Sequence, residues 1–240
     1  MKQPVRCSKA AFSPYAKLSM IPSAALKADL ESAFRRWGLP QRIKIDNGYP
    51  FKPIRSKELP SLSMLWWIGL GIDATLNNLG SPQENGTVEG LQQITYRWAN
   101  PASFSNVDQL QKALSKICRQ QRETYRIRAK GDKTRLELYP DLEQNPRKYS
   151  PQMFDLEKVK QYMARFVFIR KTGSSGVVSI AGTKINVGRN HANPFLSVTY
   201  NPDKDIWQVK SAEGKLIRES ILPSITEKKI LNFIPLSKNV

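Results

Sequence analysis

Residues 34–48 read Phe-Arg-Arg-Trp-Gly-Leu-Pro-Gln-Arg-Ile-Lys-Ile-Asp-Asn-Gly, which predicts a helix end followed by a strand. Apolar residues recur at helical spacing over 23–37, and the glycine and proline that follow end such a helix. The alternating residues 42–45 then predict a short strand. Because an Asn-Gly pair turns the chain directly after Asp46, we expect this strand to end at an acid.

A second acid follows in residues 82–89, Pro-Gln-Glu-Asn-Gly-Thr-Val-Glu, near the start of a helix expected over 81–99. An acid at a strand end and an acid in the first turns of a facing helix can converge on a divalent cation, and carboxylates are ligands that Mg²⁺ prefers. Asp46 and Glu89 are therefore the predicted metal ligands, with carboxylates roughly 4–8 Å apart.

Each acid also has a structural interpretation. An Asp before Asn-Gly is more often a turn residue, and a lone Glu on a helix is more often solvated. Glu84 competes with Glu89, but it fits a capping box with a proline at the first helical position. Glu89 is therefore the better metal candidate.

The rest of the chain divides by pattern. Residues 10–128 alternate helices and strands, which predicts an α/β sheet covered by helices. Residues 129–162 are basic and punctuated by prolines, which indicates a linker. Residues 163–222 carry short β-rich runs between turn signals, which predict a small all-β barrel. Residues 223–240 are expected to form a tail.

Besides those given above, the expected elements are a helix over 61–68, a strand over 72–76, a helix capped by Ser105, and strands over 166–169, 177–180, 184–187, 195–200, 206–209 and 215–217.

The charge of the chain is strongly positive. Thirty-eight Lys and Arg stand against 20 Asp and Glu, a formal charge of +18. Such a field attracts polyanions, so nucleic acid is the expected partner and an anionic membrane surface the second choice. A ribosomal or merely soluble basic protein remains an alternative. Two distant cysteines and a single histidine favour a reducing compartment and no zinc site. We therefore expect a cytoplasmic protein without a membrane span.

Cations crowd the stretch 119–135, and a solvated charged face is the alternative to phosphate contact there. The predicted DNA-binding residues are Arg119, Arg122, Arg126, Arg128, Lys130, Lys133 and Arg135, with Arg147 and Lys148 in the linker. Four tryptophans fall in apolar patterns and are predicted to be core residues rather than stacking platforms for bases: Trp66, Trp67, Trp98 and Trp207.

Taken in order, residues 34–40, 43–48, 70–72 and 82–89 resemble the catalytic core of DDE-type transposases and retroviral integrases, a family with a ribonuclease-H-like fold. The resemblance implies that Asp46 and Glu89 are the second and third catalytic acids, ligands of Mg²⁺ or Mn²⁺. Further on, residues 139–149 and the strands after them resemble the linker and C-terminal barrel of transposases of the phage Mu type.

The first acid of that family lies on a first strand well upstream of the second, whereas only forty-five residues precede Asp46 here. The resemblance therefore implies an N-terminally truncated core over 10–128 whose first strand is missing. We expect this chain alone to be inactive in DNA strand transfer, with Asp73 the first suspect if another acid replaced the absent one. The complete form is expected to be a homo-oligomer.

Three functions follow from these observations. The first is a DNA transposition or integration protein, a fragment of a polynucleotidyl transferase that binds transposon ends and target DNA. The second is a non-catalytic DNA-binding protein derived from a transposase, which uses the linker and barrel alone. The third is a basic structural protein associated with RNA. A metal-binding pair of acids would separate the first from the other two.

Overall fold

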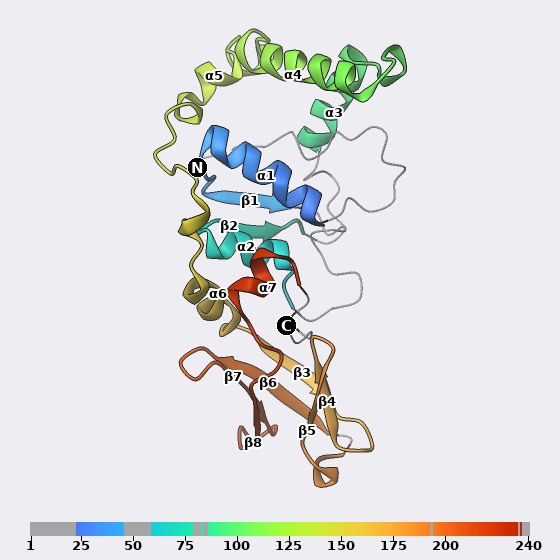
Figure 1. The fold of residues 1–240 in the computed structure, drawn as a ribbon, viewed down its shortest axis with the longest axis vertical. Helices are drawn as coiled ribbons and strands as arrows, with labels where there is room; N and C mark the ends of the chain where they lie inside the picture. The colour runs from blue at the N-terminus through green and yellow to red at the C-terminus, as the bar shows by residue number, and fades with distance from the viewer. Residues whose placement is uncertain are drawn as a thin grey trace.

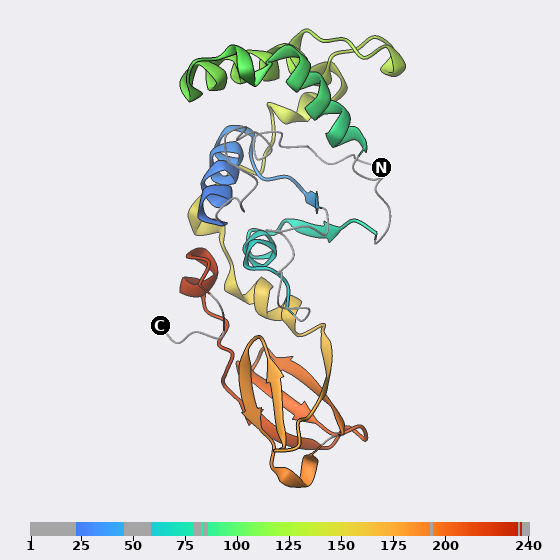
Figure 2. The ribbon, with the colours of Figure 1, turned by 90° about the vertical axis from the view of Figure 1, so that its right-hand side faces the viewer.

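The computed structural model describes residues 23–45, 59–78, 83, 86–192, 194–234 and 236. These residues form an elongated molecule with a mixed α/β fold (Figure 1). A helical unit lies at one end, a small parallel sheet with its helices lies in the middle, and an antiparallel sheet lies at the other end. Figure 2 shows the same three parts from the side.

The middle unit follows the order that the sequence predicts. Helix α1 (Ser23–Trp37) leads into strand β1 (Arg42–Ile45), and helix α2 (Leu62–Gly69) leads into strand β2 (Asp73–Leu76). The two strands are parallel, with Arg42 opposite Asp73 and Ile45 opposite Leu76. Because α2 is apolar on almost every side, it is buried between neighbouring elements.

The helical end has a small core of its own. It consists of α3 (Gly86–Trp98), α4 (Val107–Glu123) and the short α5 (Arg135–Leu138). The side chain of Asn106, rather than the predicted Ser105, caps α4 by accepting a hydrogen bond from the Gln109 N–H. The buried residues of this core are Ala99, Leu110, Leu114 and Ile117.

The C-terminal part contains all six predicted strands. Four of them form an antiparallel sheet in the order β3-β6-β7-β8, and the other two form the hairpin β4-β5. Their bounds are β3 Val167–Lys171, β4 Val177–Ile180, β5 Thr183–Asn186, β6 Phe195–Asn201, β7 Ile206–Lys210 and β8 Leu216–Ser220. Val178 and Ile185 of the hairpin belong to the same core as Val198 and Trp207 of the sheet. Among the described strands no pairing joins the two sheets into a closed barrel, so the barrel prediction is corrected to a sheet covered by a hairpin.

The segment that was expected to be a tail contains helix α7 (Glu227–Leu231), which packs against α2. Ile230 is fully buried, and the Lys27 ammonium of α1 donates a hydrogen bond of 2.5 Å to the Leu231 carbonyl. Lys229 is also buried and donates to the Ser224 hydroxyl and the Leu236 carbonyl, and its burial lowers the pKa of the ammonium. The end of the described chain is therefore part of the middle unit.

The expected linker is folded back onto the middle unit. Helix α6 (Leu156–Met163) lies in it, and Val159 and Met163 are fully buried in the main core. The ring of Phe154 lies directly over Gly69, where a β-carbon would be only 2.2 Å from the ring. Glycine at position 69 is therefore required for this close packing.

Two polar side chains of the linker hold the loops that precede β1 and β2. The Asn145 amide donates to the Trp37 and Leu39 carbonyls at 2.9 and 3.1 Å. The Arg147 guanidinium donates to the Pro40 carbonyl at 2.7 Å and to the Gly71 carbonyl at 2.8 Å. These bonds satisfy carbonyls beyond the ends of α1 and α2, which the helices themselves leave free.

We predict that Arg147→Ala lowers the free energy of unfolding by about 2 kcal/mol, because it removes charge-assisted hydrogen bonds and leaves partly buried carbonyls without a donor. Chemical denaturation monitored by circular dichroism measures this change. Lys148→Ala is the matched control, since Lys148 is exposed and has no described partner, and it should change stability by less than about 0.5 kcal/mol. Equal effects of the two substitutions would contradict the anchoring role of Arg147.

Candidate nucleic-acid interface

Helix α4 separates apolar and cationic residues on opposite faces. Leu110, Leu114 and Ile117 are buried on one face. On the opposite face three exposed cations follow at spacings of four and three residues, which places them in one row: Lys112, Lys116 and Arg119. We call these three residues the outer face of α4. With Gln111 and Ser115 they line a hollow of about 350 Å³.

The outer face of α4 has no internal electrostatic partner in the described part of the chain. No hydrogen bond or ion pair is seen for the Lys112, Lys116 or Arg119 side chains among the described residues. Glu123 is paired with Arg122 at 2.5 Å. The three cations are therefore available to an external anion.

Sequence reasoning missed Lys112 and Lys116 because it looked for the densest run of cations. The signal was present in the spacing. Positions 112, 116 and 119 fall opposite 110, 114 and 117 when the chain is placed on a helix of 3.6 residues per turn. A helical plot of residues 107–123 would have found this face.

The chain after α4 carries four more exposed cations: Arg126, Arg128, Lys130 and Lys133. Arg126 donates to the Asp132 carbonyl at 2.7 Å and lies 3.5 Å from the Glu137 carboxylate. A hydrogen bond from the Thr134 backbone N–H lowers the pKa of Glu137, so this carboxylate is ionised at neutral pH. Arg128 has no described side-chain partner and is exposed. The cationic surface thus continues beyond the helix.

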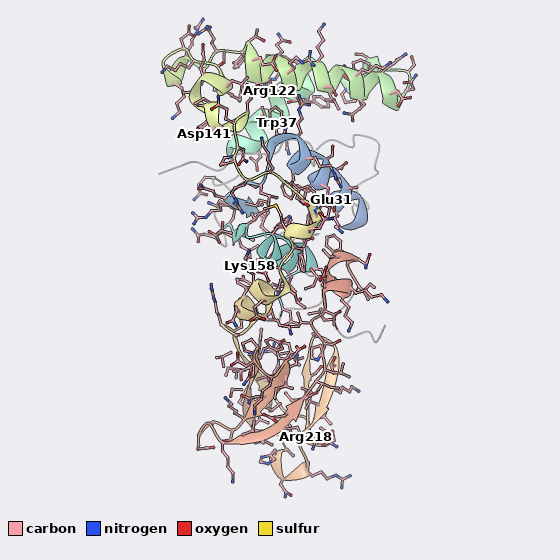
Figure 3. All side chains as sticks on the ribbon, turned by 60° about the vertical axis from the view of Figure 1, so that its left-hand side comes forward. Glu31, Trp37, Arg122, Asp141, Lys158 and Arg218 are labelled. Atoms are coloured by element: carbon pink, nitrogen blue, oxygen red, sulfur yellow. The ribbon has the colours of Figure 1, made fainter. Side chains whose placement is uncertain are left out.

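Four of the nine predicted DNA-binding residues have internal partners, and three of these four are half-buried, unlike the exposed Arg126. Arg122 is half-buried and its guanidinium lies 4.8 Å from the ring centroid of Trp37 on α1 (Figure 3). Arg135 donates to the Gln121 carbonyl at 2.7 Å, and burial lowers the pKa of its guanidinium. Arg147 is the linker anchor described above. Because these guanidiniums are engaged inside the fold, we exclude them from the interface.

The predicted acid pair is described only in part. Asp46 lies outside the described residues, so its distance from Glu89 stays a prediction. Glu89 is exposed in the first turn of α3. Figures 1 and 2 show the start of α3 on the side of the molecule toward which β1 and β2 point. Carboxyl ends of parallel strands are a common place for ligand sites. Glu89 is thus a carboxylate on this side of the molecule, and no group of three potential metal ligands occurs among the described residues.

The position of Asp73 argues against the expectation that it could replace the absent first acid. It lies at the amino end of β2, opposite Arg42, and its carboxylate is 2.6 Å from the Arg42 guanidinium. Three residues of strand, about 10 Å, separate this end of β1 from Ile45. Asp73 is therefore at the wrong end of the sheet and already has a counter-charge.

The tryptophans divide into two groups. Trp66, Trp67 and Trp207 are at most 1% exposed, as predicted for core residues. Trp98 is 39% exposed, which corrects the prediction for that residue. Its ring meets the ring of Tyr125 edge-to-face at a centroid distance of 5.4 Å, and Tyr125 is itself 40% exposed. An exposed aromatic pair therefore lies beside the cationic surface.

Comparisons with known proteins give no family for this chain. The sequence matches no protein-family model and no curated protein. Among the helices of the described residues, none is long and apolar enough to cross a membrane.

Proposed function

We propose that this protein binds DNA through the outer face of α4 and the cations that follow it. The observation that carries the proposal is the row of Lys112, Lys116 and Arg119, which is exposed, free of described partners and opposite the buried face of the same helix. A rigid helix that presents cations at fixed spacing suits a polyanion with regularly spaced phosphates.

The local charge supports this proposal. Residues 107–135 contain nine Lys and Arg against three acids, and the carboxylate of one of those acids, Glu123, is paired with Arg122. Lysine and arginine side chains that attract DNA by charge alone contact its phosphates rather than its base edges. Binding to duplex DNA is therefore expected to depend weakly on sequence and strongly on salt.

We further propose that the DNA binder is a transposition or integration protein with a ribonuclease-H-like core and a C-terminal domain of the phage Mu type. The order of α1, β1, α2, β2 and α3, with β1 parallel to β2, supports this proposal because the resembling motifs fall on these elements in the same order. In this proposal Glu89 and Asp46 hold Mg²⁺ or Mn²⁺, which would neutralise charge on a scissile phosphate. A transposase-derived protein that binds DNA without catalysis is the alternative.

The DNA interface is tested by reversing the three cations of the outer face of α4 to Glu. We predict that this variant binds a mixed-sequence duplex much more weakly, and that the slope of log K against log salt becomes shallower by about one for each lost contact. Fluorescence anisotropy between about 50 and 200 mM salt measures both quantities.

The matched control reverses three exposed cations of the C-terminal part: Lys184, Arg189 and Arg218. It changes the net charge by the same amount, so any effect of the overall field is equal in both variants. Stronger loss of binding in the control than in the α4 variant would contradict the interface and favour binding by the C-terminal sheet.

The metal proposal makes a separate prediction. Glu89→Gln and Asp46→Asn should each weaken Mn²⁺ binding about tenfold or more, since even residues behind a ligand often contribute that much to metal affinity. Electron paramagnetic resonance of free Mn²⁺ measures the affinity. Asp73→Asn removes a carboxylate at the other end of β2 and should leave Mn²⁺ binding unchanged. Unchanged Mn²⁺ affinity in the Glu89→Gln protein would favour the non-catalytic alternative.

A further inference from the structure

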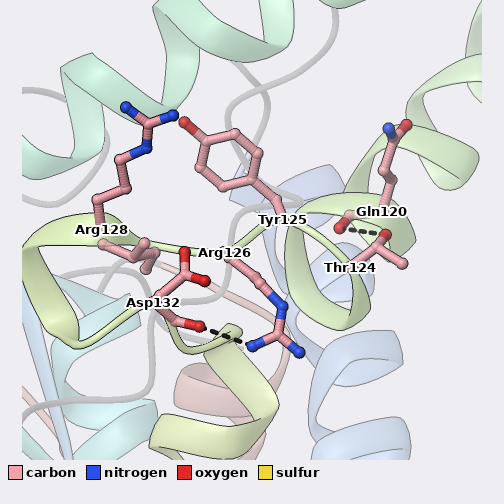
Figure 4. A pocket seen from close by; sticks show the side chains of 7 residues that line it. Gln120, Thr124, Tyr125, Arg126, Arg128 and Asp132 are labelled. Carbon is pink, nitrogen blue, oxygen red and sulfur yellow. Dashed lines mark hydrogen bonds between the residues drawn. The ribbon is translucent and has the colours of Figure 1, made fainter.

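A pocket of about 720 Å³ lies where α4 ends (Figure 4). Its lining residues are Gln120, Thr124, Tyr125, Arg126, Ile127, Arg128 and Asp132. Volumes of this order are typical of small-molecule and cofactor sites. The DNA interface proposed above does not by itself explain this pocket, because duplex phosphates need no cavity.

The chemistry of the pocket wall combines an aromatic ring with cations and neutral polar groups. Tyr125 contributes the ring, and in Figure 4 the Arg128 guanidinium points toward the Tyr125 hydroxyl. The Gln120 amide can donate to and accept from the polar edge of a ligand, whereas the Asp132 carboxylate can accept and the Thr124 hydroxyl, which already donates to the Gln120 carbonyl at 2.9 Å, can still accept. Ile127 is the one aliphatic residue of this lining, so the wall favours a flat, polar, anionic ligand over an apolar peptide.

The pocket lies C-terminal to the outer face of α4 along the same helix. Gln120 follows Lys116 by four residues and Thr124 follows Gln120 by four, so Lys112, Lys116, Gln120 and Thr124 form one row along the helix. Each step along this row advances about 6 Å. Because each step also turns about 40° around the helix axis, a nucleic-acid strand held by Lys112 and Lys116 would reach the pocket by following this row obliquely around the helix.

We propose that this pocket takes one unpaired nucleotide of the bound DNA strand, with its base against the Tyr125 ring and its phosphate at Arg128. The proposal rests on the DNA-binding function proposed above. An unpaired nucleotide is required because a base inside a duplex is stacked on both faces and cannot reach a side-chain ring. Trp98 meets the Tyr125 ring edge-to-face at 5.4 Å between centroids, and the Arg135 guanidinium lies 5.9 Å from the ring centroid, so a base would stack on the ring face away from Arg135, and Tyr125 is 40% exposed.

The test compares a blunt duplex with the same duplex carrying a short single-stranded overhang, by fluorescence anisotropy. The wild-type protein should bind the overhang duplex more tightly. Tyr125→Leu keeps apolar bulk beside Trp98 but removes the aromatic face, and it should weaken overhang binding about tenfold while blunt-duplex binding and its salt slope stay the same. Tyr125→Phe keeps the ring and should retain the wild-type preference.

A 2-aminopurine in the overhang gives an independent readout in the wild-type protein, since its fluorescence responds to stacking. A change of this signal on binding, lost in Tyr125→Leu, supports the pocket. Equal wild-type affinity for blunt and overhang duplexes, or equal weakening of both by Tyr125→Leu, would overturn it. Deoxyadenosine monophosphate that displaced the overhang as effectively as an unlabelled oligonucleotide would also overturn it, because the pocket would then serve free nucleotides.

These outcomes distinguish a failure of the pocket proposal from a failure of the proposed DNA interface. Reversal of Lys112, Lys116 and Arg119 should weaken binding to blunt and overhang duplexes alike, whereas Tyr125→Leu changes only the difference between the two. If the α4 reversal had no effect, the proposed function would fail. If only the difference between substrates were absent, the pocket proposal alone would fail.

Discussion

Hydrogen bonds between the linker and the ends of α1 and α2 fix the course of the chain beside the middle unit. Arg147 bridges the Pro40 and Gly71 carbonyls, and the Arg147 carbonyl accepts a hydrogen bond from the Leu39 N–H at 2.7 Å. Gly38, at φ +75°, allows this approach because a β-carbon there would lie 2.7 Å from the Arg147 carbonyl oxygen. The chain is thereby fixed between the helical end and the C-terminal sheet.

The cations of this protein fall into two groups, those bonded inside the fold and those that project from it. Arg147 donates to the Pro40 and Gly71 carbonyls, and the Arg122 guanidinium pairs with the Glu123 carboxylate and lies over the Trp37 ring. Cations on the outer face of α4, such as Lys112 and Lys116, have no such partner in the described structure. Among the described residues, the positive charge thus divides between cations engaged inside the fold and cations without a described partner.

Local patterns predicted most of the elements but few of the tertiary contacts. Gly38, Asn106 and the alternating residues 42–45 are local signals, and the structure follows them, with the α4 cap displaced by one residue from Ser105. Whether an arginine meets a phosphate or a carbonyl depends on residues far away in sequence, so Arg147 could not be assigned from composition. Tyr125 continues the apolar period of α4, but the helix ends at Glu123 and leaves the ring exposed. Of the acid pair, the structure describes Glu89, and the pairing with Asp46 stays a prediction.

Lysine footprinting tests the central claim, that DNA lies along the outer face of α4, most directly. The protein is acetylated with and without a mixed-sequence duplex, and the modified lysines are quantified by mass spectrometry. The account predicts that DNA protects Lys112 and Lys116, while the exposed Lys184 and Lys204 of the C-terminal part react as before. Protection of Lys184 and Lys204 with unchanged reactivity at Lys112 and Lys116 would contradict it.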